Sequence, residues 1–96
     1  MLQQIVAKVL SYITLTQPNS TGYRIKGEVS NCLAVIGEQI DRNGLEVYDK
    51  VIKVLADLAT DKVWAVQAPA RKALQVWNAK KRQWDEQFYA KNERVA

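Results

Sequence analysis

The segment YRIKGEVSNCLAVIGEQI, residues 23–40, shares its pattern of apolar residues with residues 64–81 of the same chain. Sliding the sequence against itself by 41 positions places Leu33 on Leu74. Within each segment the apolar residues recur at spacings of three and four, which is the period of one helical face. The two segments are therefore predicted to be equivalent helices of an internal repeat. Leu33 and Leu74 occupy the same position in these helices, and we expect both to be buried in the core. The other apolar pairs in this alignment are Ile25 with Val66, Val29 with Ala70, and Ile36 with Trp77.

A second alignment extends the repeat to the helices that precede these two segments. A slide of 42 positions pairs Val9 with Val51 and Ile13 with Leu55. Two helices per unit and a period of about 40 residues are typical of a helical solenoid. We expect one domain, residues 1–96, with a first repeat at about 2–40, a second at about 45–77 and a helical extension at about 78–92.

Helix-breaking residues separate the predicted helices. TQPNSTG, residues 16–22, contains a proline, a glycine and polar residues that favour turns or cap the next helix, and DRNG, residues 41–44, ends in a pair that closes helices. The stretch TDKVW, residues 60–64, offers Thr and Asp as caps for a fourth helix that begins near its end. Pro69 then lies within about the first turn of that helix, where backbone N–H groups lack partners. A helix that began at Asp61 instead would be kinked at Pro69.

The quoted segments resemble HEAT repeats. Residues 23–40 are similar to a second HEAT helix, with an apolar-Arg start, small and apolar residues, and an Ile-Gly pair. Residues 55–77, LADLATDKVWAVQAPARKALQVW, resemble the end of a first HEAT helix, its Asp-containing turn and the next helix. The resemblance covers residues 5–77, although Gln67 stands where HEAT repeats often have Arg. It implies an all-α fold of two HEAT-like or armadillo-like hairpins, an α-solenoid fragment, with a long C-terminal helix.

A narrower resemblance concerns DKVWAVQAPARKALQVW, residues 61–77, which looks like the closing repeat of TOG-like HEAT domains in plant tortifolia/spiral microtubule-binding proteins. Such domains bind tubulin or the microtubule lattice through the turns inside each repeat, here residues 16–22 and 60–64. The resemblance implies that Lys62 and Trp64 bind the partner, because an exposed Trp beside a Lys supplies an aromatic anchor and a charge. The alternative is that Trp64 packs on the third helix as core.

The C-terminal third carries the positive charge of the chain. Residues 61–96 hold eight Lys/Arg and four Asp/Glu, whereas residues 1–60 hold six of each, and the net charge is +4. We expect Lys80, Lys81 and Arg82 to form a basic flank that attracts an acidic partner.

Aromatic residues follow the helical spacing in the same region. Trp77, Trp84 and Phe88 lie seven and four residues apart and so share one face. We expect the first three helices to be too short to cover Trp84 and Phe88, which predicts that both bind a partner. The alternative is that these aromatic side chains close the open end of the repeat as a cap.

Several classes of function are excluded by composition. The chain has no histidine, a single cysteine and no Gly-rich phosphate loop, so we expect neither catalysis nor a metal or cofactor. Cys32 lies in an apolar stretch and is predicted to be an inert core thiol. No apolar run approaches the roughly 18 residues of a membrane span, and the first residues do not resemble a signal peptide. We expect a soluble, cytoplasmic or cytoskeletal protein.

These observations predict a non-enzymatic interaction scaffold or adaptor that binds a protein, with tubulin or the microtubule as the specific partner. One alternative is an assembly module that works by self-association or in a hetero-complex, without tubulin contact. Another is a basic nucleic-acid-binding protein, with Lys80, Lys81 and Arg82 on phosphates and Trp84 stacked on a base. Nucleic acid is the weaker alternative because Asp85 and Glu86 follow at once. The narrow apolar face argues against a membrane surface.

Overall fold

The computed structural model describes the backbone of residues 2–14, 19–40 and 44–95, with side chains up to residue 87 except that of residue 14. Over these ranges the fold is all-helical, as the sequence predicts, and the last helix is much the longest. The helices are α1, Leu2–Thr14; α2, Ser20–Gln39; α3, Leu45–Ala59; and α4, Trp64–Val95.

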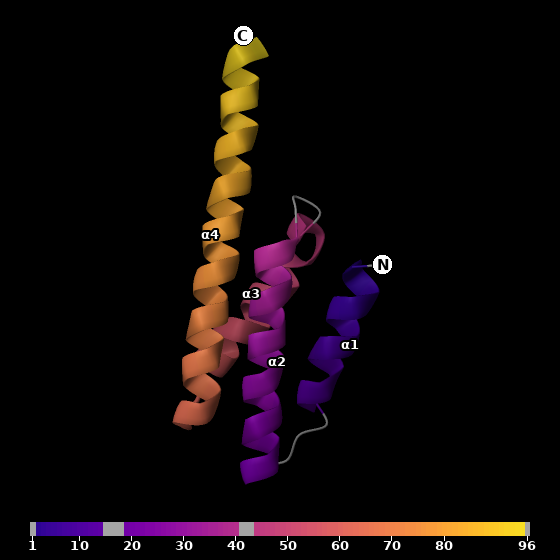
Figure 1. Cartoon of the computed structure of the whole chain (residues 1–96), viewed down its shortest axis with the longest axis vertical. Coiled ribbons are helices and arrows are strands. Elements are labelled where there is room, and N and C mark those ends of the chain that lie inside the picture. The colour runs from indigo at the N-terminus through magenta and orange to yellow at the C-terminus, as the bar shows by residue number, and fades with distance from the viewer. Residues whose placement is uncertain (1, 15–18, 41–43, 96) are drawn as a thin grey trace.

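The helices alternate in direction (Figure 1). α1 and α3 run one way and α2 and α4 run the other, so that α2 and α4 both begin at the same end of the molecule. The most extensive packing is between α2 and α4, followed by α3 on α4, α1 on α2 and α1 on α3. The C-terminal part of α4 extends beyond the other helices, which makes the molecule 55 Å long.

The start of α2 is fixed by a side-chain cap. Asn19 Oδ1 accepts a hydrogen bond of 2.9 Å from the backbone N–H of Gly22 and so satisfies one of the free donors of the first turn. As a result α2 begins at Ser20, inside the turn predicted at residues 16–22. That prediction is wrong for its last three residues, and residues 16–18 lie outside the described part of the chain.

The start of α4 agrees with the sequence prediction. Asp61 Oδ1 accepts a 2.8 Å hydrogen bond from the N–H of Val63, and the carbonyl oxygen of Val63 accepts hydrogen bonds of 3.0 Å from the next turn. These contacts begin the helix at Trp64. The backbone of Trp64, the first residue of α4, therefore lies between the Asp61–Val63 hydrogen bond and the first turn of the helix.

Pro69 lies deeper in α4 than predicted. It is the sixth residue of the helix, beyond the first turn, and it leaves the carbonyl oxygen of Ala65 without the usual N–H donor. That oxygen faces α2, because a β-carbon added to Gly27 would lie 2.7 Å from it. The missing side chain of Gly27 is what lets α2 approach this turn of α4.

The interface between α2 and α4 is the centre of the core. Trp77 is fully buried, and its indole Nε1 donates a 2.7 Å hydrogen bond to the backbone oxygen of Leu33. A β-carbon on Gly37 would lie 2.8 Å from that nitrogen, so the ring fits only against a glycine. α2 presents the small buried residues Gly27, Ser30, Ala34 and Gly37, and α4 presents the buried residues Val66, Ala70, Ala73 and Trp77.

Two predictions of burial need correction. Cys32 is exposed, and the prediction of an inert core thiol is wrong, because this side of α2 borders an open groove beside α1. Leu33 is fully buried, as expected for its repeat position, but the equivalent Leu74 is only partly buried. The two positions align in sequence and differ in their neighbours.

Candidate protein-interaction surface

Trp64 is the most exposed large apolar side chain in the described part of the chain. It is 72% exposed at the first position of α4, so the alternative in which it packs on α3 as core is wrong. Lys62, two residues earlier, is also exposed. The turn thus presents an aromatic ring and a cation from backbone that the Asp61 cap and the helix hold in place.

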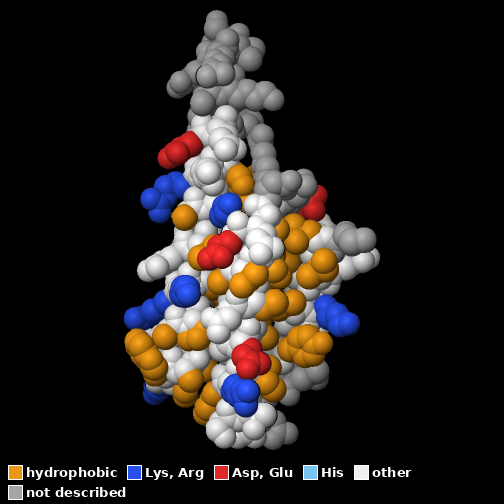
Figure 2. Space-filling view, viewed as in Figure 1, with side chains coloured by type: hydrophobic (Ala, Val, Ile, Leu, Met, Phe, Trp, Pro, Cys, Tyr) orange, Lys and Arg blue, Asp and Glu red, His pale blue; other side chains and the backbone are white. Residues whose placement is uncertain are grey.

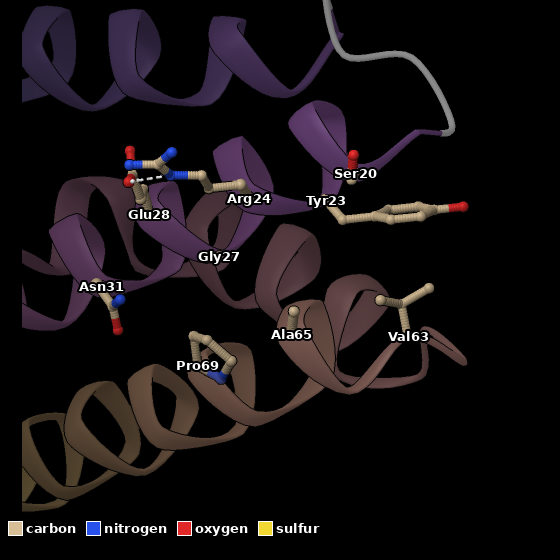
Figure 3. A pocket seen from close by; sticks show the side chains of 9 residues that line it. All are labelled: Ser20, Tyr23, Arg24, Gly27, Glu28, Asn31, Val63, Ala65 and Pro69. Atoms are coloured by element: carbon tan, nitrogen blue, oxygen red, sulfur yellow. Dashed lines mark hydrogen bonds and ion pairs between the residues drawn. The ribbon is translucent and has the colours of Figure 1, made fainter.

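A groove opens beside this turn, between the starts of α2 and α4 (Figure 3). Its volume is about 340 Å³, and Gly27 forms part of its floor. On the α2 side Arg24 and Glu28 form an exposed ion pair of 3.3 Å. An apolar segment of a partner could occupy this groove while its polar groups meet the rim. The apolar part of the lining consists of Tyr23, Val63, Ala65 and Pro69.

Exposed basic residues continue from Trp64 along α4. Arg71 and Arg82 follow it by seven and eighteen residues, which places all three within about 20° of one direction around the helix. Lys72 is exposed beside Arg71, and the first acidic residue of α4 is Asp85. We call Lys62, Trp64, Arg71, Lys72 and Arg82 the basic stripe. Figure 2 shows basic side chains along the α4 edge of the molecule.

The predicted flank of Lys80, Lys81 and Arg82 is divided by the helix. Consecutive helical residues point about 100° apart, and of these three residues Arg82 is exposed whereas Lys80 and Lys81 are partly buried. Lys81 Nζ lies 2.9 Å from Asp85 Oδ2 and 5.4 Å from the centre of the Tyr48 ring. The hydrogen bond to Asp85 raises the pKa of Lys81 above its ordinary value. Lys81 therefore joins α4 internally and to α3.

Trp84 is not available as a partner anchor. It is 4% exposed, and a β-carbon on Gly44 would lie 2.7 Å from its Cη2 atom. The prediction that the first three helices cannot cover it is wrong, because α4 runs antiparallel to α3 and passes the corner between α2 and α3. This supports the alternative in which the aromatic face closes the end of the repeat. The side chain of Phe88 lies outside the described residues.

Two further grooves were missed by the sequence analysis. One, of about 330 Å³, lies between α1 and α2 and includes Tyr12 and Cys32 in its lining. The other, of about 740 Å³, lies beside α1 and α3, with Lys50 and Lys53 in its lining. Figure 2 shows apolar side chains gathered over the α1–α2 region. The sequence signal for the first groove is the spacing of Ile5, Val9 and Tyr12 along one side of α1; that Ile5 and Tyr12 are exposed is known from the structure alone.

Comparison with known proteins adds no assignment. No family model matches the chain, and neither does any curated protein or solved structure. Within the described ranges there is no group of three or more His, Cys, Asp or Glu residues that could hold a metal ion. None of the helices, over the residues that the structure describes, is long and apolar enough to cross a membrane.

Proposed function

We propose that this chain is a non-enzymatic protein-interaction module that binds an acidic protein partner through the basic stripe and the adjoining α2–α4 groove. The observation that carries the proposal is the 72% exposure of Trp64 at the start of α4, directly after the turn held by the hydrogen bond from the Val63 N–H to Asp61 Oδ1. Trp and Arg are the residues that most often dominate binding energy at interfaces, and both occur in the stripe.

The packing of the helices supports a HEAT-like arrangement as part of the same proposal. α2 packs on α4 and α1 on α3, while α1 packs on α2 and α3 on α4. Two stacked hairpins with equivalent helices side by side would have these neighbours. Such an arrangement places the starts of α2 and α4 at one end, where the resemblance to TOG-like domains puts the binding turns.

Tubulin, or the microtubule lattice, is the specific partner that this resemblance suggests. An acidic protein surface would meet Lys62, Arg71 and Arg82, while an apolar residue of the partner would pack on Trp64 and enter the groove. Trp84 is buried, so the nucleic-acid alternative loses the stacking residue that it requires.

Co-pelleting with microtubules tests the proposal. We expect the full chain to pellet with untreated microtubules and less with microtubules whose acidic tails have been cleaved. Trp64→Ala should weaken binding about thirtyfold, the equivalent of about 2 kcal/mol. Replacing Arg71, Lys72 and Arg82 together by Gln should slow association and remove most of its salt dependence.

Tyr12→Ala and Lys53→Gln are the matched controls, because each removes an exposed aromatic ring or cation outside the stripe. Both should pellet like the unchanged chain. A chain that fails to pellet with either form of microtubule excludes tubulin as the partner. A gel shift with generic RNA or DNA that depends on Trp64 would replace the proposal by nucleic-acid binding.

A further inference from the structure

The first repeat exposes apolar side chains on the side away from the second repeat. Ile5 is 49% and Tyr12 48% exposed, and these lie one turn before and after Val9. Val9, Tyr12, Ile25 and Cys32 line the groove between α1 and α2. We call these residues, with Ile5, the α1–α2 face.

Four of the five positions of this face align with buried residues of the second repeat, and the fifth, Tyr12, aligns with the partly buried Val54. The slide of 41 positions aligns Cys32 with Ala73 and Ile25 with Val66, and both residues of α4 are fully buried. The slide of 42 positions aligns Ile5 with Val47, which is 3% exposed. The difference has a simple cause, since the second repeat is covered by the first.

The residues that provide this cover are small. α2 packs on α4 through Gly27 and Gly37, where added β-carbons would lie 2.7 Å from the Ala65 oxygen and 2.8 Å from the Trp77 ring. A helix that is to cover the α1–α2 face in the same way needs small residues at the same spacing. The full small set on α2 is Gly27, Ser30, Ala34 and Gly37.

A second copy of this chain does not meet that requirement in a head-to-tail arrangement. The positions of α4 that align with the small set of α2 are Ala68, Arg71, Gln75 and Asn78. Arg71, Gln75 and Asn78 are exposed polar residues; Arg71 is charged, and Asn78 Oδ1 also accepts a 2.6 Å hydrogen bond from the Tyr48 hydroxyl of α3. The outer side of α4 therefore resembles the polar face of a terminal repeat and cannot approach an apolar groove closely.

We propose that the α1–α2 face is a docking surface for a further helical hairpin of the same kind, whose second helix carries small residues at the spacing of α2. The interface would continue the α2–α4 interface by one repeat. It does not use the residues of the basic stripe, which lie on the side of α4 away from α2. The inference rests on the HEAT-like arrangement proposed above and not on tubulin binding, so a chain that fails to pellet with microtubules leaves it standing.

An extended chain tests the docking. A copy of residues 1–43 is joined directly to residue 2 of the full chain, because the slide of 42 positions aligns residue 2 with residue 44. The added copy carries Cys32→Ser, so that a thiol reagent reports on the original Cys32 alone. We expect that thiol to react at least about tenfold more slowly than in the unextended chain. A slowing of this size follows if the added hairpin is docked more than about 90% of the time and Cys32 reacts only when it is undocked.

A matched control carries Gly27→Leu and Gly37→Leu in the added copy, at positions that face the next hairpin. It should restore the reactivity of Cys32. Equal reactivity in the extended and unextended chains overturns the proposal, as does equal protection by the Leu variant. Protection of Cys32 in the unextended chain, with a doubled mass in light scattering, would show that a second copy occupies the face and would also overturn it.

A second variant keeps the test decisive if the added copy does not fold. Ala68→Gly, Arg71→Ser, Gln75→Ala and Asn78→Gly give the outer side of α4 the small set of α2. We expect this chain to associate head to tail, with its mass rising with concentration and Cys32 becoming protected, and Tyr12→Asp should reverse both. If this variant stays monomeric in light scattering and its Cys32 stays reactive at the highest concentration tested, the proposed docking surface is contradicted.

Discussion

α2 and α4 align in sequence, yet they bury different sides. α4 buries the residues that face α2 and α3, whereas several equivalent positions of α2, including Cys32, border an open groove. α2 instead buries Gly27 and Gly37 against α4, and the equivalent Asn78 is exposed. A position in this molecule is thus buried where its helix faces a neighbouring helix. The residue at that position is small where the two helices approach closely, as at Gly27 and Gly37. Small residues occur where α2 meets α4. Exposed polar residues occur on the opposite side of α4, where Asn78 Oδ1 also accepts a 2.6 Å hydrogen bond from the Tyr48 hydroxyl of α3.

The pair Trp77 on α4 and Ile36 on α2 should show the largest difference between aligned positions of the two helices. Trp77 is fully buried and hydrogen-bonded to Leu33, so Trp77→Ala should cost about 3–5 kcal/mol of unfolding free energy. Ile36 is partly buried, and Ile36→Ala should cost less than half as much. Urea unfolding of both variants measures the difference.

Trp77→Phe serves as the control for the hydrogen bond. It keeps an aromatic ring and loses the indole N–H, so it should cost about 1–2 kcal/mol beyond the loss of volume. Equal costs for Trp77→Ala and Ile36→Ala would mean that the two helices have the same neighbours and that the comparison is wrong.

The pair Leu33 and Leu74 should give a smaller difference. Leu33→Ala removes a fully buried side chain and should cost about 2–5 kcal/mol. Leu74 is partly buried, and its truncation should cost about 1–2 kcal/mol because part of the apolar surface is already in water. Thermal unfolding measures both losses of stability. If Leu74→Ala costs as much as Leu33→Ala, then Leu74 is covered by something other than the four helices that the structure describes.

The sequence predicted helices and their order well, because the apolar period is a local property. The starts of α3 and α4 followed from breakers and caps, as at Asp61 and Trp64. Burial was predicted less well for Cys32, Leu74 and Trp84. Each depends on which helix lies opposite, and the periodicity of one helix does not contain that information.

The candidate site shows the same division. The sequence left open whether Trp64 is exposed or packs on α3, and its 72% exposure depends on which helix lies opposite the start of α4. The division of Lys80, Lys81 and Arg82 could have been predicted from the angle of about 100° per residue. The contact of Lys81 with Tyr48 could not, since it depends on how α3 packs against α4.

Gly37 tests whether residue size follows burial. Gly37→Ala would place a β-carbon 2.8 Å from the Trp77 ring, and overpacking of this kind costs about 1–3 kcal/mol, partly offset by the better helix propensity of Ala. Ala79→Leu on the exposed side of α4 is the control and should be nearly neutral. Thermal unfolding measures both. If the Gly37→Ala chain is more stable than the original, α2 and α4 can move apart enough to fit the β-carbon without a loss of unfolding free energy.

The smallest expected effect compares the ion pairs of the two repeats. Arg24 and Glu28 are 3.3 Å apart and largely exposed, whereas Lys81 and Asp85 are 2.9 Å apart, half-buried, and adjacent to the Tyr48 ring. Glu28→Gln should leave stability unchanged, because exposed pairs contribute little. Asp85→Asn should lower the pKa of Lys81 toward its ordinary value of about 10.5 and reduce stability slightly.

The sign of the pH dependence follows from the direction of this shift. The hydrogen bond to Asp85 raises the pKa of Lys81 in the folded chain, so its stabilising contribution is fully present below the ordinary pKa. The contribution is lost as the pH rises through the raised value. The stability difference between the original chain and Lys81→Gln should therefore be constant from pH 7 to about pH 10 and vanish above. An NMR titration of the Lys81 side chain locates the transition, and a midpoint at or below the ordinary lysine value of about 10.5 would contradict the pairing with Asp85.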